Sequence, residues 1–323
     1  MFEVVFLDRA TLAEQIQFKK LAPNSTYIEY SQTLNEQTVD RLKNATIAIT
    51  NKVILDAKIL SQLPQLKCIC VAATGFNIID LQYCKQKNIT VTNITNYAKH
   101  TVSEHVFMLM LCLTKQLKSY ERTLKENAWQ KSKQFCYFTS PIHLLKGKTL
   151  GLIGTGEIAK QTAKIASAFA MKVNFYSPSN RHSVDQKTCV DLNTILSTSD
   201  IISIHCPLNK DTESLISEKE LLMMKKNCIL INTARGPIVD SFALINALQN
   251  KTIGAAGLDV LPTEPPHIND IAMQNLMLDN LIITPHIAWA SIEAMQILAD
   301  QLIDKVNAFL TNSLKAQDNL STL

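Results

Sequence analysis

Three polar residues in the C-terminal half of the sequence could perform acid–base chemistry together. Arg235, Glu264 and His286 each follow a short apolar segment with the composition of a buried strand. Because the carboxyl ends of parallel strands meet at one edge of a sheet, we expect the three side chains to converge. A guanidinium binds a carboxylate through two parallel hydrogen bonds. A carboxylate beside an imidazole orients the ring and favours its protonated form.

This set suits a 2-keto acid as substrate. Arg235 would bind the substrate carboxylate, and the pair of His286 and Glu264 would protonate the carbonyl oxygen. A nicotinamide would supply the hydride. Taken singly, each residue has an ordinary interpretation: Arg235 as a phosphate neighbour, Glu264 as loop surface and His286 as a hydrogen-bonded core group. Their joint position favours the catalytic interpretation.

A glycine turn within residues 148–159 predicts where the nucleotide binds. Gly154 can turn where a Cβ atom would clash, and Gly156 allows a ligand close to the backbone. Ala159 takes the third position of the dinucleotide-binding pattern and is small enough for a helix to pack on its strand. The N–H groups at such a helix start suit a pyrophosphate. On its own the motif is also compatible with a simple strand-to-helix turn.

The end of the next predicted strand, 172–176, bears on the choice of nucleotide. Units that prefer NAD usually carry Asp or Glu at this point, and here the residue is Ser177, followed by Arg181. A lost carboxylate and a gained cation suit a 2′-phosphate. The sequence therefore predicts that NADP(H) is used at least as well as NAD(H). The alternative is that Ser177 bonds the ribose hydroxyls of NAD and that Arg181 is solvated.

The alternation of predicted elements indicates two α/β regions, each with a parallel sheet covered by helices. Helical stretches are expected at 34–42 and 55–63, and a long amphipathic helix at 291–311 could return to the first region. A six-stranded doubly wound sheet is expected from residue 147 onward. The strands are expected at 4–7, 47–50, 68–72 and 90–92 in the first region. In the second region they are expected at the start of 148–159, at 172–176, within 200–208 together with a turn, and at 228–232, 255–260 and 281–286.

Two further features lie before the glycine turn. Thr74, Gly75 and Phe76 follow a predicted strand and could offer backbone N–H groups to an anion, although an ordinary turn would have the same composition. Thr101 and Glu104 form a capping box in sequence. The helix that this box predicts would place one face in the core, and we expect the histidines near its start to be structural. That face consists of Val102, Val106, Leu109, Leu113 and Leu117, and the histidines are His100 and His105.

Residues 120–146 carry aromatic side chains among lysines and polar residues, without helical or strand periodicity. Such a segment often packs outside its own domain. We therefore expect it to be a dimerisation arm. The aromatic residues are Trp129, Phe135, Tyr137 and Phe138.

Composition excludes several classes of protein. The 323 residues are 46% hydrophobic and 19% charged, and the net charge of +4 comes from scattered lysines, which argues against nucleic-acid binding. The N-terminus reads as a strand instead of a signal peptide, and the apolar run 106–113 is too short to cross a membrane. Eight cysteines without a C-x-x-C pair predict reduced thiols in a cytoplasmic protein without a metal.

With these residues in view, the sequence resembles the D-2-hydroxyacid dehydrogenase family over nearly its whole length, and most closely its glycerate dehydrogenase (hydroxypyruvate reductase) branch. Three departures concern Ala159 in place of the third glycine, Ser177 in place of the acid, and Phe76 where glycerate-type members often carry Thr. The matching segments are Ala73 to Asp80, Tyr97 with Val102 to His105, Trp129, Leu150 to Gly156, His205 to Leu208 with Thr212, Asn232 to Asp240, Gly257 to Val260 with Glu264 and Pro265, and Thr284 to Ala290.

The resemblance implies an enzyme that reduces a small 2-keto acid, of hydroxypyruvate or glyoxylate type, to the D-2-hydroxy acid. It implies a homodimer of two doubly wound domains: a flavodoxin-like outer substrate domain of 1–99 plus 290–323, and a Rossmann-type inner domain of 100–289 that carries the dimer contact. The implied catalytic set is Arg235, Glu264 and His286. The implied substrate contacts are Thr74, Gly75, Phe76, Arg235, His286 and Trp289. The implied cofactor contacts are Thr101, Gly154, Gly156, Glu157, Ile158, Ser177, Arg181, Cys206, Pro207, Thr212, Thr233, Ala234, Arg235, Asp259, His286 and Ala288, with Asp259 meeting the nicotinamide amide.

Two other functions stay open on the sequence. Some relatives of this fold act as NAD(H)-sensing scaffolds for protein partners and have little turnover, and an intact triad does not exclude that role. A methyltransferase would share only the glycine turn and would leave Arg235, Glu264 and His286 without a function.

Overall fold

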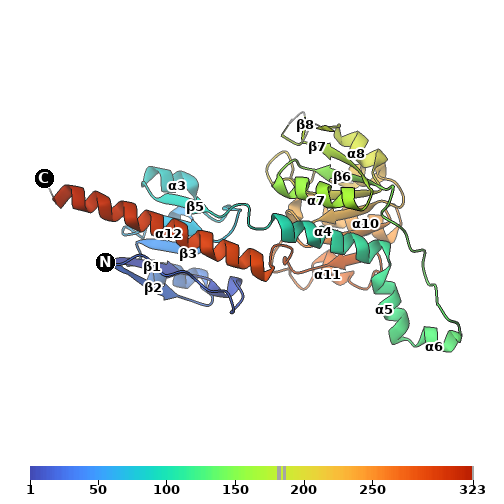
Figure 1. Cartoon of the computed structure of the whole chain (residues 1–323), viewed down its shortest axis with the longest axis horizontal. Helices are drawn as coiled ribbons and strands as arrows, with labels where there is room; N and C mark the ends of the chain where they lie inside the picture. Colours follow the sequence, from blue (N-terminus) through green and yellow to red (C-terminus); the bar gives the residue numbers. More distant parts are fainter. Residues whose placement is uncertain (180–182, 185–186, 322–323) are drawn as a thin grey trace. The chain divides into compact units, whose positions relative to one another are not determined.

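The structure is a computed structural model that describes residues 1–179, 183–184 and 187–321. The chain divides into two units (Figure 1). Unit 1 comprises Met1–Ala98 and Ala290–Leu323, and unit 2 comprises Lys99–Trp289. Each unit is built around its own parallel sheet, so the two are described separately.

The sheet of unit 1 has five parallel strands in the order β2-β1-β3-β4-β5, which is the flavodoxin-like order. The central strands are buried on both faces, as expected for a parallel sheet covered by helices. The sequence did not predict β2, because this edge strand is mostly exposed and lacks an apolar run. The strands are β1 (Phe2–Phe6), β2 (Ser25–Glu29), β3 (Ile47–Thr50), β4 (Cys68–Val71) and β5 (Thr90–Asn93).

Short helices connect these strands, and one long helix covers β4. Asp56 and Asp80 cap α2 and α3 by accepting hydrogen bonds from backbone N–H groups in the first turn of each helix. The long helix α12 (Ile292–Ser321) packs along β4, and its Gln296 and Asn307 bond the backbone of residues 17–22. The expected helical stretch 34–42 is present as η2 followed by α1, whereas the stretch expected at 55–63 is reduced to α2. The short helices are η1 (Arg9–Thr11), η2 (Asn35–Gln37), α1 (Thr38–Leu42), α2 (Ala57–Leu60) and α3 (Leu81–Gln86).

The sheet of unit 2 has six parallel strands in the order β13-β12-β11-β10-β6-β7. The chain runs from β6 outward to β7 and then returns to β10 on the other side of β6, so the strand order reverses between β6 and β10. This doubly wound arrangement confirms the predicted fold class. The strands are β6 (Thr149–Ile153), β7 (Lys172–Tyr176), β10 (Ile201–Ile204), β11 (Ile229–Asn232), β12 (Ala255–Leu258) and β13 (Leu281–Ile283), with a separate hairpin of β8 (Ser183–Val184) and β9 (Lys187–Thr188).

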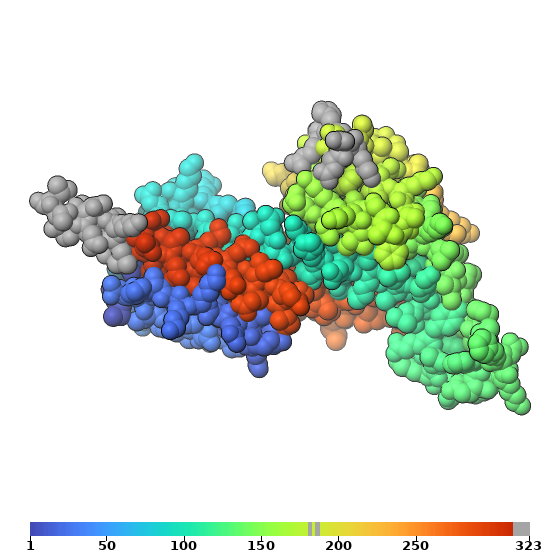
Figure 2. All heavy atoms as spheres, in the orientation of Figure 1, coloured from blue at the N-terminus to red at the C-terminus, as the bar shows by residue number. Residues whose placement is uncertain are grey.

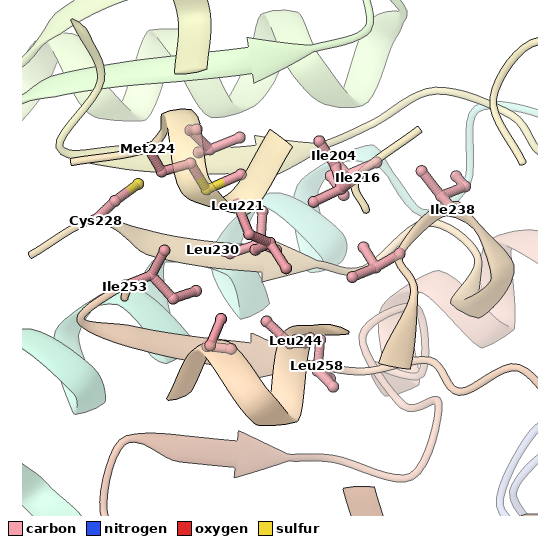
Figure 3. Packing of buried hydrophobic residues seen from close by; sticks show 14 of the residues in the cluster. Ile204, Ile216, Leu221, Met224, Cys228, Leu230, Ile238, Leu244, Ile253 and Leu258 are labelled. Carbon is pink, nitrogen blue, oxygen red and sulfur yellow. The ribbon is translucent and has the colours of Figure 1, made fainter. Parts of the chain in front are cut away.

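Helices cover both faces of this sheet. On one face, α4 (Lys99–Thr114) and α7 (Glu157–Ala168) pack together and bury Ala159. On the other face, Leu221, Leu230 and Leu244 are among the side chains that meet in a continuous apolar core (Figure 3). The helices of this second face are α8 (Leu192–Thr198), α9 (Glu218–Met223), α10 (Ser241–Gln249) and α11 (Ile271–Gln274).

The predicted start and length of α4 were both wrong. The helix begins at Lys99, two residues before the expected cap, because the Thr101 hydroxyl donates to the carbonyl of Ala288 instead of capping the helix. It ends at Thr114. Gln116 is left-handed, with φ of 57°, and the exposed Leu117 belongs to the next helix.

Residues 117–146 form a projection of unit 2, which we call the arm (Figures 1 and 2). It contains α5 (Leu117–Lys125), α6 (Ala128–Ser132) and the following segment without regular structure. Its root is fixed, because the Lys118 ammonium donates to three backbone carbonyls between Leu276 and Leu281. Arg122 adds two bonds to the Asp279 carboxylate, at 2.7 and 2.5 Å.

All eight cysteines are free thiols. Among the described residues, no three metal-ligating side chains cluster in a way that could hold an ion. The same part of the chain contains no helix with the length and apolarity needed to cross a membrane.

Candidate active site

The glycine turn lies where the strand order reverses, which is where open α/β sheets bind ligands. Gly154 has φ of 120°, and a Cβ atom there would meet the carbonyl of His205 at 2.5 Å. Gly156 begins α7 without a side-chain cap, and no described atom lies within 4 Å of the position of a Cβ there. The turn therefore leaves the positive end of a twelve-residue helix open to an anion.

Ser177 follows β7 directly, beside the same turn. Gly154 N–H donates to the carbonyl of Tyr176 at 2.8 Å, which ties the turn to the end of β7. Ser177 is 4% exposed, and its Oγ lies 3.3 Å from Oγ of Ser179. Arg181, the second residue of the cofactor prediction, lies outside the described residues.

The loop after β10 is held by its own hydrogen bonds. The Thr212 hydroxyl donates to the carbonyl of Pro207 at 2.7 Å and accepts from Asn209 N–H at 2.8 Å. Burial raises the pKa of Cys206 to about 11 and lowers the pKa of His205 to about 4, so both side chains are neutral at pH 7. His205 and Cys206 therefore add no charge to the end of β10.

The end of β11 presents Arg235 and a hydroxyl without a partner. The Asn232 side chain bonds both Ala234 N–H and the carbonyl of Arg235, and so fixes the turn. The half-buried Arg235 guanidinium donates to the carbonyl of Ala234 at 2.7 Å. Within the described structure, Thr233 Oγ1 is buried and makes no hydrogen bond, although buried hydroxyls normally do.

Gly236 joins this turn to the loop that carries Glu264. A Cβ atom at Gly236 would collide with the backbone of Leu261. Leu261 N–H donates to Oε1 of Glu264 at 2.9 Å. The backbone after Arg235 therefore packs directly on the residue that orients Glu264.

His286 and Glu264 form a close pair. Nδ1 of His286 lies 2.5 Å from Oε2 of Glu264. With Oε1 bonded to Leu261 N–H, both carboxylate oxygens have partners and the imidazole plane is fixed. The contact expected between these two residues from their positions after β12 and β13 is present.

The backbone of His286 is left-handed, with φ of 55°, a conformation that costs on the order of 1–3 kcal/mol for a residue other than glycine. His286 N–H donates to the carbonyl of Asp259 at 2.8 Å. The Asp259 side chain is 1% exposed and accepts from Ile287 N–H and Ala288 N–H, both at 2.9 Å. Trp289 Nε1 donates to the carbonyl of His286 at 3.0 Å.

His105 has a partner in this network that the sequence did not reveal. Its Nε2 lies 2.9 Å from Oγ1 of Thr284 and 3.5 Å from Oδ1 of Asp259. Burial lowers the pKa of His105, while the charge of Asp259 opposes that shift. Its spacing of one helical turn from Thr101 could have indicated that both face the same segment.

In unit 1, the predicted substrate loop follows β4. The Thr74 hydroxyl donates to the carbonyl of Ile94 at 3.0 Å, so it serves the loop itself. Asn93 donates its side-chain N–H to the carbonyl of Thr74 at 2.7 Å. Phe76 is exposed. The backbone N–H groups of this turn remain the predicted anion contacts.

These residues fit a nicotinamide dinucleotide. The open helix start at Gly156 suits a pyrophosphate. The buried Thr233 hydroxyl at the end of β11 makes no hydrogen bond within the described structure, so a polar group of a bound ligand could serve as its partner. A doubly wound sheet with such a turn, and with a histidine–carboxylate pair after its last strands, is the arrangement expected of a dinucleotide-dependent dehydrogenase.

Comparison with known proteins agrees with this class. Residues 107–288 match the D-isomer specific 2-hydroxyacid dehydrogenase, NAD binding domain. The chain is 48% identical to a glycerate dehydrogenase from Methylorubrum extorquens over 309 residues, covering 95% of this chain and 96% of the relative. The chain belongs to the D-2-hydroxyacid dehydrogenase family.

Solved structures show the same fold. A D-lactate dehydrogenase from Aquifex aeolicus, complexed with NAD and lactic acid, has a TM-score of 0.81 and 32% identity, covering 97% of this chain and 96% of that one. An acyclic imino acid reductase in complex with NADPH and D-Arg has a TM-score of 0.81 and 29% identity, covering 96% of this chain and 98% of that one.

Proposed function

We propose that this chain reduces a small 2-keto acid, of hydroxypyruvate or glyoxylate type, to the D-2-hydroxy acid. The observation that carries the proposal is the pair formed by His286 and Glu264, 2.5 Å apart. The similarity to a glycerate dehydrogenase supports a substrate of three carbons or fewer. The catalytic roles rest on the chemistry of the side chains.

In this proposal His286 donates a proton to the substrate carbonyl oxygen through Nε2, because Nδ1 faces Glu264. Glu264 holds the ring through the contact of its Oε2 with Nδ1. Arg235 exchanges its bond to the carbonyl of Ala234 for two bonds to the substrate carboxylate. The backbone N–H groups at 74–76 are proposed to bind the same carboxylate. The nicotinamide, when bound, supplies the hydride.

The test is to follow oxidation of NADH and NADPH with a panel of 2-keto acids and purified protein. We expect hydroxypyruvate and glyoxylate to be reduced with higher kcat/KM than branched or aromatic 2-keto acids. If the protein binds NADH tightly but reduces none of the acids, the scaffold function is favoured instead.

We further propose that NADP(H) is used at least as well as NAD(H), because Ser177 is neutral where a carboxylate would repel a 2′-phosphate. Ser177→Asp is expected to shift the ratio of kcat/KM toward NADH, since a carboxylate there accepts from ribose hydroxyls. Steady-state kinetics with both cofactors measure this ratio.

Ser167→Asp is the matched control. It adds the same charge on the exposed last turn of α7, about 15 Å along the helix from the glycine turn. The ratio should not change in this variant. A wild-type protein that ignores NADPH would contradict the proposal.

We also propose that the arm is the contact between two copies of the chain in a homodimer. Phe135 and Phe138 are 96% and 74% exposed, and Leu144 near the end of the arm is also exposed. Monomeric proteins rarely expose contiguous apolar surface of this kind.

Changing both arm residues, Phe135→Ser with Phe138→Ser, is expected to convert the dimer to a monomer, because the substitution removes aromatic surface buried at the interface. Light scattering coupled to size exclusion measures the mass. Phe242→Ser is the matched control, since Phe242 is 67% exposed on α10, outside the arm. A wild-type monomer, or an unchanged mass in the double variant, would contradict this proposal.

A further inference from the structure

One face of α4 contacts both ends of the segment that carries His286. Thr101 and His105 are one turn apart on this helix. The Thr101 hydroxyl donates to the carbonyl of Ala288 at 3.0 Å, and Nε2 of His105 lies 2.9 Å from Oγ1 of Thr284. The segment 284–288 is therefore attached to α4 on either side of His286.

The direction of each hydrogen bond follows from the atoms involved. Thr284 Oγ1 lies 2.5 Å from Oδ1 of Asp259, and an ionised carboxylate can only accept, so the hydroxyl proton points at Asp259. The same oxygen can then only accept from His105. The Nε2 atom of His105 must therefore carry a proton, which fixes its tautomer when the ring is neutral.

The Asp259 carboxylate connects the Thr284 hydroxyl to the backbone of the segment that carries His286. Oδ1 of Asp259 accepts from Thr284 and from Ile287 N–H, and Oδ2 accepts from Ala288 N–H. These two N–H groups follow His286, whose own N–H is bonded to the Asp259 carbonyl. The carboxylate and carbonyl of one residue thus hold the left-handed turn in place.

A neutral imidazole is suited to this role. Burial lowers the pKa of His105, so the ring donates its proton without placing a positive charge beside Asp259. The Asp259 side chain meanwhile accepts hydrogen bonds from the N–H groups of Ile287 and Ala288, and bonds to a carboxylate are stronger than bonds between neutral groups.

We propose that His105 is a positioning residue for the proton donor His286. The Thr284 hydroxyl donates to Asp259 and accepts from His105 Nε2–H, so the two partners together fix its direction. The Asp259 carboxylate, held in this way, binds the turn that carries the His286 imidazole. This inference rests on the proposed function, because it takes His286 as the proton donor.

His105→Leu removes the donor and is expected to lower kcat roughly 10–100-fold, the range found when the partner behind a working side chain is lost. His105→Gln keeps an N–H donor at the end of a side chain of similar reach and should recover most of the lost kcat.

Thr284→Val tests the same chain of bonds with a nearly isosteric change and should give a similar loss. The double variant with His105→Leu should be no slower than the slower single variant, because both act through one network. Thr114→Val is the matched control on α4, where the hydroxyl bonds only its own helix, and its kcat should be normal.

Amide hydrogen exchange gives a readout independent of turnover. The N–H groups of Ile287 and Ala288 should exchange faster in His105→Leu than in the wild type. A normal kcat in both His105→Leu and Thr284→Val would overturn the inference. So would a loss in His105→Gln as large as in His105→Leu, since it would show that the ring is needed only for packing.

His286→Ala, measured alongside, separates the two proposals. If that variant keeps its turnover, the proposed function itself fails. If it is inactive while the His105 variants are normal, only the positioning inference fails.

Discussion

Replacing His286 with alanine is expected to lower kcat roughly 10²–10⁴-fold, which is what general acid catalysis contributes. The imidazole bonded to Glu264 is the proposed proton donor, and alanine has no group to replace it. Cofactor affinity should change much less, because the open turn at Gly156 does not depend on this residue. Steady-state kinetics and fluorescence titration with NADH or NADPH measure the two quantities.

The left-handed backbone of His286 requires a companion variant. Alanine is strained at φ of 55°, whereas asparagine adopts this conformation readily, so His286→Asn is expected to destabilise the fold less than His286→Ala. Both variants should lose turnover. A near-normal rate in either, with an unchanged unfolding temperature, would show that another group donates the proton.

Arg235→Lys is expected to lower kcat/KM for keto-acid reduction by more than about 2 kcal/mol, although the charge is kept. An ammonium is a point charge and cannot make the two parallel bonds that a guanidinium makes to a carboxylate. The Asn232 side chain fixes the backbone turn that carries residue 235, so a lysine there starts from the same backbone position as the arginine. Initial rates over a range of keto-acid concentrations measure the loss.

Arg41→Lys provides the control for this change, because Arg41 bonds a loop carbonyl of unit 1 and packs on the Tyr30 ring. Its kinetics should be those of the wild type. Normal kinetics in Arg235→Lys would instead assign carboxylate binding to the N–H groups at 74–76 alone.

The central strands of unit 2 could be predicted from the sequence because β6, β10, β11 and β12 are short runs of mostly apolar residues that are buried almost throughout. All six have the predicted order along the chain. β2 could not be predicted in the same way, since four of its five residues are exposed and the segment has no buried apolar run, although Thr26, Tyr27 and Ile28 favour strands. Burial of the strand, more than β propensity, produced the signal.

For the candidate site, positions set by the strand topology could be predicted, whereas long-range side-chain contacts could not. Residues at strand ends were predictable, because parallel strands bring their carboxyl ends to one edge. The bond from Thr101 to Ala288 spans 187 positions, and no local pattern reports it. The predicted capping box failed for this reason: a tertiary partner took the hydroxyl that a cap would have used. The contact between His105 and Thr284 depends likewise on how α4 is rotated against the sheet.

The contact between Gly236 and Leu261 limits how this protein can change its specificity. Because no side chain fits between the two backbones, the turn of Arg235 and the loop of Glu264 move as one body. A library that reshapes residues 261–264 to admit larger acids is expected to displace the Arg235 guanidinium as well. Under the proposed function, affinity for the keto acid and turnover would then change together. Residues 74–76 belong to unit 1 and have no part in this contact. If they bind the substrate carboxylate as proposed, variation there is expected to change the substrate range independently.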